Sequence, residues 1–314
     1  SSTSPIELFA QDKDGNNILK KGAKIIVDNF NRIAMGPDIE EFLASSEGID
    51  TLFSSRIHYN YPTEESIKKL TGLNIIFNDV SQGNKDLVLG RLRDYWKTLN
   101  QETKNSIKIL EFGSDNYFLN KLNQPLVTNA FAEPNGQATF RAKELSMNLK
   151  TFRHESAHLR HYQVIRDYNP KLTEIMYELS KLEEPSSSEY IKLRKKFFLI
   201  VKEEESKLST FGGKWKEIAG TDYDLYDEFG GGYVMDPKNK GAKYGLIRSY
   251  GGKNIFEDIA TFVEEVNNPS FFKPLINPQD DKYDVRYEQK LALLHEYKFI
   301  SDEEYNKILE VAEV

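Results

Sequence analysis

The stretch of the sequence with the clearest chemical pattern is His154-Glu155-Ser156-Ala157-His158. Residues four apart lie on one face of a helix, so the two imidazoles can bind the same tetrahedral metal ion. The glutamate between them points toward the same open side, where a carboxylate can take a proton from an activated water and pass it to a leaving amine. The pattern predicts that His154 and His158 bind Zn²⁺ and that Glu155 is the catalytic base.

A catalytic zinc site also needs a third protein ligand and a position for water. In metzincins that ligand is a histidine ten residues after the first one, but this chain has Val164 there, which excludes that route. In gluzincins the ligand is a glutamate from a later helix, and Glu257 is the best candidate. Glu257 lies in a predicted helix whose buried face is formed by the apolar residues Ile255, Ile259, Phe262 and Val266.

Several other carboxylates remain alternatives to Glu257 as the third ligand. Glu264 and Glu265 follow it in the same predicted helix. The interval of 98 residues between His158 and Glu257 is long for a gluzincin, and we interpret it as an extra helical lobe. Further acidic residues that could replace Glu257 lie within this interval: Asp222, Asp224, Asp227 and Glu228.

The run Ser-Tyr-Gly-x-x-Asn-x-x-Glu-x-x-Ala, from Ser249 to Ala260, resembles the third-ligand segment of anthrax lethal factor-like metallopeptidases. It is also similar to the corresponding segment of the zinc-binding peptidases that occur as surface lipoproteins in Bacteroidetes. The resemblance covers residues 145–310 at the level of motifs. It implies a zincin-like fold, the zinc ligands His154, His158 and Glu257, and secretion or a cell-surface location, including as a lipoprotein tethered through a removed N-terminus.

The same resemblance assigns a role to Tyr250, which lies seven positions before the third ligand. In the family a tyrosine there donates a hydrogen bond to the oxyanion, and a phenol aimed at developing negative charge stabilises the transition state by a few kcal/mol. Tyr244 is the alternative. Asp258, next to the third ligand, is expected to support a metal-binding histidine through its outer N–H.

The remaining histidines are expected to have structural roles. His161 shares the metal-facing side of its helix only approximately, so we expect it at the surface or beside a ligand and not on the metal. His58 and His295 stand alone in the sequence. Neither has neighbours whose spacing suggests a site.

Composition restricts the class of protein. Hydrophobic residues make up 39% and aromatic residues 12% of 314 residues, which predicts a folded globular chain. The net charge of −7 argues against nucleic acid as a partner. Cysteine is absent, which excludes disulfides and thiolate zinc sites. No apolar run approaches the roughly 20 residues that cross a bilayer, and the opening Ser-Ser-Thr-Ser-Pro suggests a trimmed or mature form.

Periodicity along the chain predicts an α+β protein in three parts. Residues 1–70 are an irregular N-terminal extension. Residues 71–168 are an upper zincin subdomain, in which short strands lead to the active-site helix. Residues 169–314 are a helical lower subdomain that carries the third ligand. The predicted strands are 73–80, 107–112, 126–131 and 138–145, and the predicted helices are 148–167, 171–182, 188–208, 255–266, 283–297 and 301–312, with a further helix around 89–99.

The function predicted from these features is hydrolysis of peptide bonds by a zinc metallopeptidase acting on peptide or protein substrates. The strand 138–145, directly before the active-site helix, is the candidate edge strand for pairing with a substrate backbone. Two other readings stay open. One is an inactive zincin-fold binding or accessory protein in which zinc is structural, and the other is a helical protein without metal.

Overall fold

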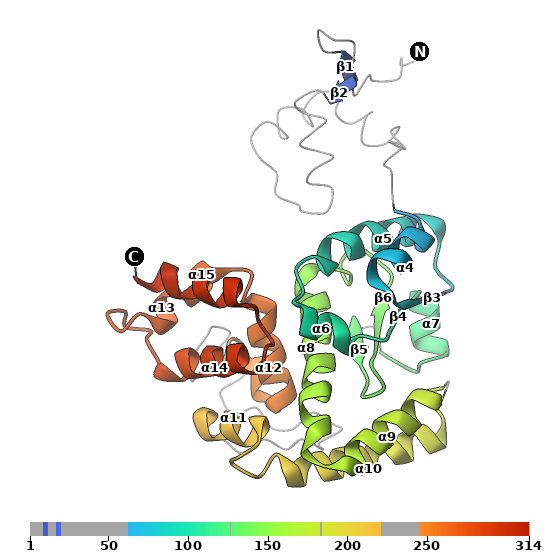
Figure 1. Ribbon diagram of the computed structural model, residues 1–314. Coiled ribbons are helices and arrows are strands. Elements are labelled where there is room, and N and C mark those ends of the chain that lie inside the picture. The colour runs from blue at the N-terminus through green and yellow to red at the C-terminus, as the bar shows by residue number, and fades with distance from the viewer. Residues whose placement is uncertain are drawn as a thin grey trace. The chain divides into compact units, whose positions relative to one another are not determined.

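The computed structural model describes residues 62–125, 127–182, 184–220 and 245–313, together with two short strands near the N-terminus (Figure 1). The chain divides into two compact units, residues 1–61 and 62–314. In the first unit, β1 (Phe9–Gln11) pairs antiparallel with β2 (Asn17–Leu19). The second unit contains all the residues of the candidate site that the structure describes.

The second unit is a mixed α+β structure with one small sheet. Its strands are β3 (Asn74–Asn78), β4 (Ile109–Gly113), β5 (Ala130–Ala132) and β6 (Gln137–Arg141). The strand order is β3-β4-β6-β5, with β3, β4 and β6 parallel and β5 antiparallel to β6. β5 and β6 are joined by a turn at Pro134-Asn135-Gly136, in which Gly136 has a φ of 88°. Each of the four predicted strands has a counterpart in the sheet, but all four are shorter than predicted, and β5 overlaps its predicted range only at residues 130 and 131.

The position of β6 corrects the prediction for the strand before the active-site helix. β6 lies between β4 and β5, so its backbone is paired on both sides. The edge strand on this side of the sheet is β5, which the sequence predicted only as a strand. Local sequence patterns show which residues form strands but not the order of the strands in the sheet.

Side chains alternate between the two faces of the sheet along each strand, and aromatic residues make one face apolar. Phe112 and Phe140 lie side by side on this face, with ring centroids 5.7 Å apart. Phe140 stacks on Phe152, 5.8 Å away, and Phe152 meets Tyr95 at 5.7 Å. Aromatic contacts thus tie the sheet to two helices, which contain Tyr95 and Phe152.

The helices of the first part of this unit begin at polar caps. In α4 (Glu64–Thr71), the side chain of Thr63 accepts the backbone N–H of Ser66. In α5 (Gln82–Trp96), Ser81 caps in the same way. The helix α8 (Leu149–Ile165) begins at Asn148, whose side-chain oxygen accepts the N–H of Thr151. Such caps each contribute about 1 kcal/mol and fix where each helix begins.

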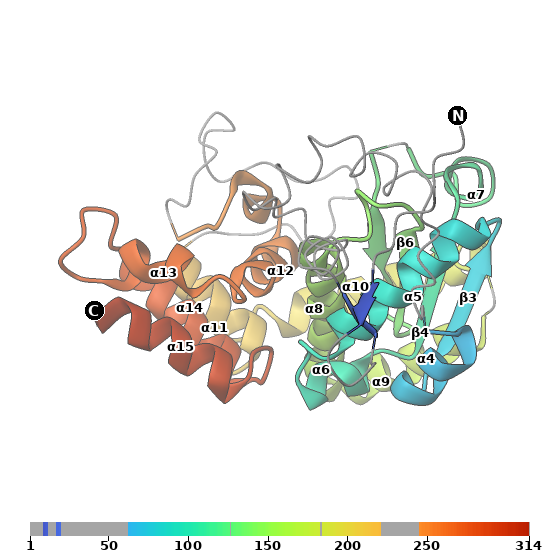
Figure 2. The same cartoon turned by 90° about the horizontal axis from the view of Figure 1, so that it is seen from above.

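α8 lies between the two halves of the unit. Figure 2 shows α8 with the sheet, α4 and α5 on one side and the C-terminal helices on the other. The remaining helices are α6 (Gln101–Ser106), α7 (Asp115–Asn120), α9 (Pro170–Lys181), α10 (Ser188–Glu204), α11 (Phe211–Ala219), α12 (Ile255–Glu265), α13 (Pro269–Ile276), α14 (Val285–Glu296) and α15 (Asp302–Glu313), with short 3₁₀ turns η1 (Arg166–Tyr168) and η2 (Ser249–Gly252).

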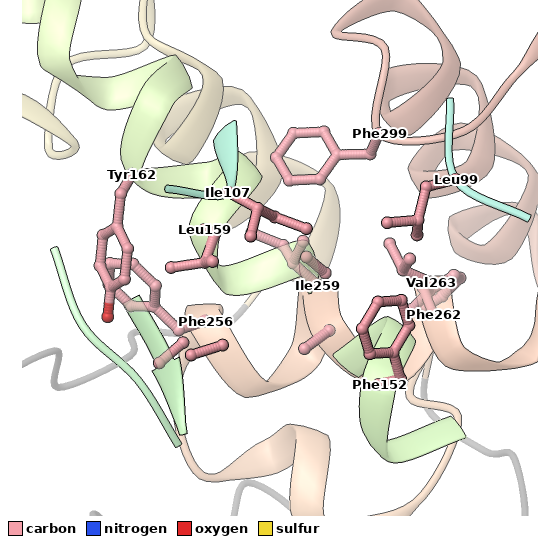
Figure 3. Packing of buried hydrophobic residues seen from close by; sticks show 14 of the residues in the cluster. Leu99, Ile107, Phe152, Leu159, Tyr162, Phe256, Ile259, Phe262, Val263 and Phe299 are labelled. Carbon is pink, nitrogen blue, oxygen red and sulfur yellow. The ribbon is translucent and has the colours of Figure 1, made fainter. Parts of the chain in front are cut away.

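The contact between α8 and α12 forms much of the core (Figure 3). Phe152 and Leu159 of α8 are buried, as are Ile259 and Phe262 of α12, each with at most 1% of its surface exposed. Burying a side chain of this size contributes about 1.5–3 kcal/mol. This apolar packing holds the polar faces of the two helices in a fixed relation.

The predicted helices at 148–167, 171–182, 188–208, 255–266, 283–297 and 301–312 are confirmed as α8, α9, α10, α12, α14 and α15, and the one around 89–99 as α5. Among the described residues, no helix combines the length and the apolar character needed to cross a membrane.

Candidate metal centre

The first half of the site lies on α8. His154 and His158 are one helical turn apart, and their rings meet edge to face with centroids 4.8 Å apart. Both are largely buried, at 7% and 8% exposure, and Glu155 between them is 6% exposed. The structure therefore places the three predicted residues of the motif together at the same partly enclosed position.

The second half of the site lies at the start of α12. The side chain of Asn254 accepts the backbone N–H of Glu257 at 2.9 Å and so begins the helix there. This cap places Glu257 in the first turn, facing α8 and not the apolar core.

The predicted ligands converge. Glu257 Oε2 lies 2.8 Å from His154 Nε2 and 3.5 Å from His158 Nε2. One ligand atom from each of the three residues falls within a group no wider than 4.8 Å. Two imidazole nitrogens and a carboxylate oxygen suit a divalent transition-metal ion. This group can therefore hold a metal ion.

Burial and mutual contact determine the protonation of the group. Burial would lower the pKa of His154, but its hydrogen bonds to Glu257 and Glu264 raise that pKa to about 10. Burial would raise the pKa of Glu257, but His158 and His154 hold it well below its usual value. Glu155 differs, because burial raises its pKa against the opposing effect of the two histidines. A carboxylate with a raised pKa suits proton transfer.

The outer nitrogen of His154 has its own carboxylate partner. Glu264 Oε2 lies 3.2 Å from His154 Nδ1, and Arg248 Nε donates to Glu264 Oε1 at 2.8 Å. Glu264 thus lies behind His154, a predicted ligand, and does not take the place of Glu257. The other alternative ligand, Glu265, forms an ion pair with Lys150.

We expect Glu264→Gln to weaken metal binding by 10- to 100-fold, the usual cost of losing a carboxylate behind a metal-binding histidine. The amide keeps the shape of the side chain but loses the charge that orients the imidazole. Competition with a chelator of known affinity measures the change. An unchanged affinity would mean that Glu264 does not support His154.

Tyr250 lies beside Glu257, the predicted third ligand. Its hydroxyl donates to Glu257 Oε1 at 3.2 Å, and its ring centroid is 6.0 Å from that of His154. Burial and the charge of Glu257 raise the pKa of Tyr250, so the phenol stays protonated and remains a donor. η2 packs closely on α12 at Gly251, where a Cβ would lie 2.9 Å from Thr261 Oγ1.

The structure gives Asp258 a different set of contacts from those expected. Its Oδ2 accepts hydrogen bonds from Trp215 Nε1 at 2.9 Å and from Lys290 Nζ at 2.7 Å, with the lysine also bonded to the carbonyl of Gly245. The supporting carboxylate on His154 is Glu264 instead. The local spacing that placed Asp258 next to Glu257 also turned it about 100° around the helix, toward α11 and α14.

We expect Lys290→Met to lower the free energy of unfolding by about 3–5 kcal/mol, because it leaves the carboxylate of Asp258 buried without the lysine cation. Lys290 and Asp258 both have an exposed fraction of 0%. Urea unfolding of the chelator-treated protein measures the change. The double variant Lys290→Met/Asp258→Asn should recover part of the loss. A single variant as stable as wild type would contradict a stabilising ion pair.

The other histidines lie away from the metal group. His161 is fully buried, so the expectation of a surface position is wrong; its Nε2 lies 2.8 Å from Glu205 Oε1 and its ring packs on Phe256. His295 Nε2 lies 2.6 Å from Asp302 Oδ1, a structural contact as expected. The remaining predicted alternatives lie outside the described residues: His58, Asp222, Asp224, Asp227, Glu228 and Tyr244.

A cleft of about 620 Å³ opens at the metal group. His154, Glu155 and His158 line it together with Glu257 and Tyr250. The edge strand β5 contributes all three of its residues to the wall, and α10 contributes a further part. The cleft therefore joins the candidate metal group to a strand edge that no described strand pairs with, whereas the sequence predicted that edge on the strand that became β6.

Comparisons of this chain with protein-family models, with curated proteins and with solved structures give no match.

Proposed function

We propose that this protein is a zinc-dependent metallopeptidase of the gluzincin type with a zincin-like fold. The observation that carries the proposal is the convergence of His154 Nε2, His158 Nε2 and Glu257 Oε2 in a cleft that also contains Glu155. Two histidines and one glutamate are the ligand set of catalytic zinc in thermolysin-like peptidases. A metal that only braces the fold would not need an acid–base group beside it.

In this proposal, His154, His158 and Glu257 would hold Zn²⁺, which would supply a Lewis acid for activating a water and polarising the scissile carbonyl. Glu155 accepts the proton of that water on its carboxylate and then delivers it to the nitrogen of the leaving amine. Tyr250 turns its hydroxyl from Glu257 to the carbonyl oxygen as negative charge develops there. The raised pKa values of Glu155 and Tyr250 suit a proton shuttle and a hydrogen-bond donor, respectively.

The edge strand β5 gives the proposed substrate a place to bind. A peptide in extended conformation can pair through main-chain hydrogen bonds, whatever its sequence, with the edge of Ala130–Ala132 that no described strand occupies. Because β5 lines the same cleft as His154 and Glu155, a peptide paired there runs past the metal group. This arrangement favours a polypeptide over a compact small molecule as the substrate.

Metal analysis combined with a peptide library tests the proposal. We expect about one zinc per chain after purification without added metal. Cleavage of peptides should stop on chelation and return when zinc is restored. Less than about 0.2 zinc per chain would contradict a resident zinc site. One zinc per chain without cleavage of any peptide would favour the accessory or binding role, with zinc as a structural ion.

A further inference from the structure

The wall of the cleft formed by α10 carries charges that the proposed chemistry does not use. Arg194 and Lys195 come from α10, and Lys253 lies just before α12. Apart from Glu155 and Glu257, the described lining contains one other carboxylate, that of Glu133. Arg194 therefore places a cation in this wall of the cleft, where it can attract negative charge on a ligand.

Arg194 is held in a fixed orientation. Its Nε donates to Glu133 Oε2 at 2.9 Å, and the same oxygen accepts the hydroxyl of Tyr190 at 3.1 Å. The guanidinium carbon lies 4.8 Å from the ring centroid of Phe198, within the range of a cation–π contact. One hydrogen bond and one stacking contact therefore position the plane of the guanidinium before any ligand binds.

The terminal amino groups of Arg194 remain available for a ligand. Among the described residues, the hydrogen bond to Glu133 is made by Nε, and neither Nη1 nor Nη2 has a partner. The side chain is 35% exposed and lines the cleft. A guanidinium presents five N–H donors in a planar fork that matches the two oxygens of a carboxylate.

The geometry points to Arg194 as a specificity residue that binds a carboxylate of the substrate. The carboxylate is either an aspartate or glutamate side chain near the scissile bond or the C-terminal carboxylate of the peptide. This inference rests on the proposed peptidase function, because it assigns a substrate preference to the same cleft. The anchor on Glu133 reduces the rotamer entropy that binding would otherwise cost.

Peptide binding to the zinc-loaded Glu155→Gln protein tests the inference without requiring turnover. Matched peptides present glutamate or glutamine at each position, and each has a free or an amidated C-terminus. We expect acidic peptides to bind about tenfold more tightly than their neutral counterparts, as for a charge-assisted bidentate contact in a wet cleft. Whether the side chain or the terminus carries the preference identifies the source of the carboxylate.

Variants of Arg194 test whether this residue causes the preference for acidic peptides. In the Glu155→Gln background, Arg194→Gln should bring acidic and neutral peptides to within about twofold, and Arg194→Lys should keep a reduced preference because it retains charge but not the fork. Lys196→Gln is the matched control, since Lys196 is an exposed lysine of α10 outside the cleft lining. The double variant Arg194→Gln/Glu133→Gln removes the unpaired carboxylate and should also lack the preference.

Two outcomes would overturn the inference. The first is equal binding of acidic and neutral peptides by the protein with Arg194 intact, or no peptide binding at all. The second is a preference that survives Arg194→Gln or disappears equally in Lys196→Gln. Failure of the peptidase proposal is distinct, because it appears as absence of cleavage by wild type while the binding preference and its loss in Arg194→Gln persist.

Discussion

Replacing Glu155 by glutamine is expected to lower kcat/KM for peptide hydrolysis by about 10²- to 10⁴-fold, the usual contribution of a positioned acid–base group. The amide has nearly the same shape, but it cannot take up a proton and pass it on. Zinc content should stay near that of wild type, because Glu155 is not one of the three converging ligands. Steady-state rates on a cleaved library peptide and metal analysis of the same samples measure both quantities.

Glu217→Gln is a suitable control for this experiment. Glu217 is an exposed glutamate of α11 outside the cleft lining, so the same chemical change there should leave the rate unaltered. If Glu155→Gln kept the wild-type rate, the base would have to be another group. If it lost zinc, its effect on the rate would reflect the metal site and not proton transfer.

His158→Ala is expected to have the second large effect. It removes one of the two imidazoles, so zinc affinity should fall by more than the 10- to 100-fold expected for the supporting carboxylate Glu264. Peptide hydrolysis should be lost with the metal. Chelation, which we expect to lower the melting temperature of wild type, should have little effect on the variant, because binding to the native state is the source of that stabilisation.

The matched control is His295→Ala, because His295 is paired with Asp302 and lies outside the metal group. Its zinc content should equal that of wild type. A His158→Ala protein that still held one tightly bound zinc would show that the metal binds elsewhere. Chelator competition distinguishes the two cases more sharply than zinc content alone.

The ligand group could be predicted because its signal is mostly local. His154 and His158 are one turn apart in a single helix, so their convergence needs no knowledge of the rest of the fold. Glu257 is distant in sequence, and its selection depended on an amphipathic helix pattern and on a motif resemblance. The structure brings all three together.

The supporting residues were harder to predict, because their roles depend on how helices pack. Glu264 lies seven residues after Glu257, about two turns along the same face, and that spacing was a usable signal. Asp258 was favoured instead because it is adjacent to the ligand, yet one residue along a helix changes the direction of a side chain by about 100°. Arg194 is noticed only once α10 is known to border the cleft.

Five of the described helices were not predicted: α4, α6, α7, α11 and α13. In two of them, α11 and α13, the residues argue against a helix. α11 starts with Phe211 followed by two glycines, which have low helix propensity. Gly213 is required by close packing, since a Cβ there would lie 2.0 Å from the carbonyl oxygen of Lys207. α13 contains Pro274 in addition to the favourable Pro269 at its start. Tertiary contacts outweigh these local preferences.

Different helices supply the candidate metal group and the wall of the cleft, and this affects how the substrate preference of the protein can change. In the proposed function the ion-binding atoms and the proton shuttle come from α8 and α12, whereas Arg194 and Lys195 of the cleft wall come from α10. α10 packs on α9, and its Phe198 also contacts Tyr162 of α8 and Phe256 of α12. Evolution or protein engineering can therefore change the charged positions of α10 to accept different polypeptides while Phe198 keeps its contacts with α8 and α12.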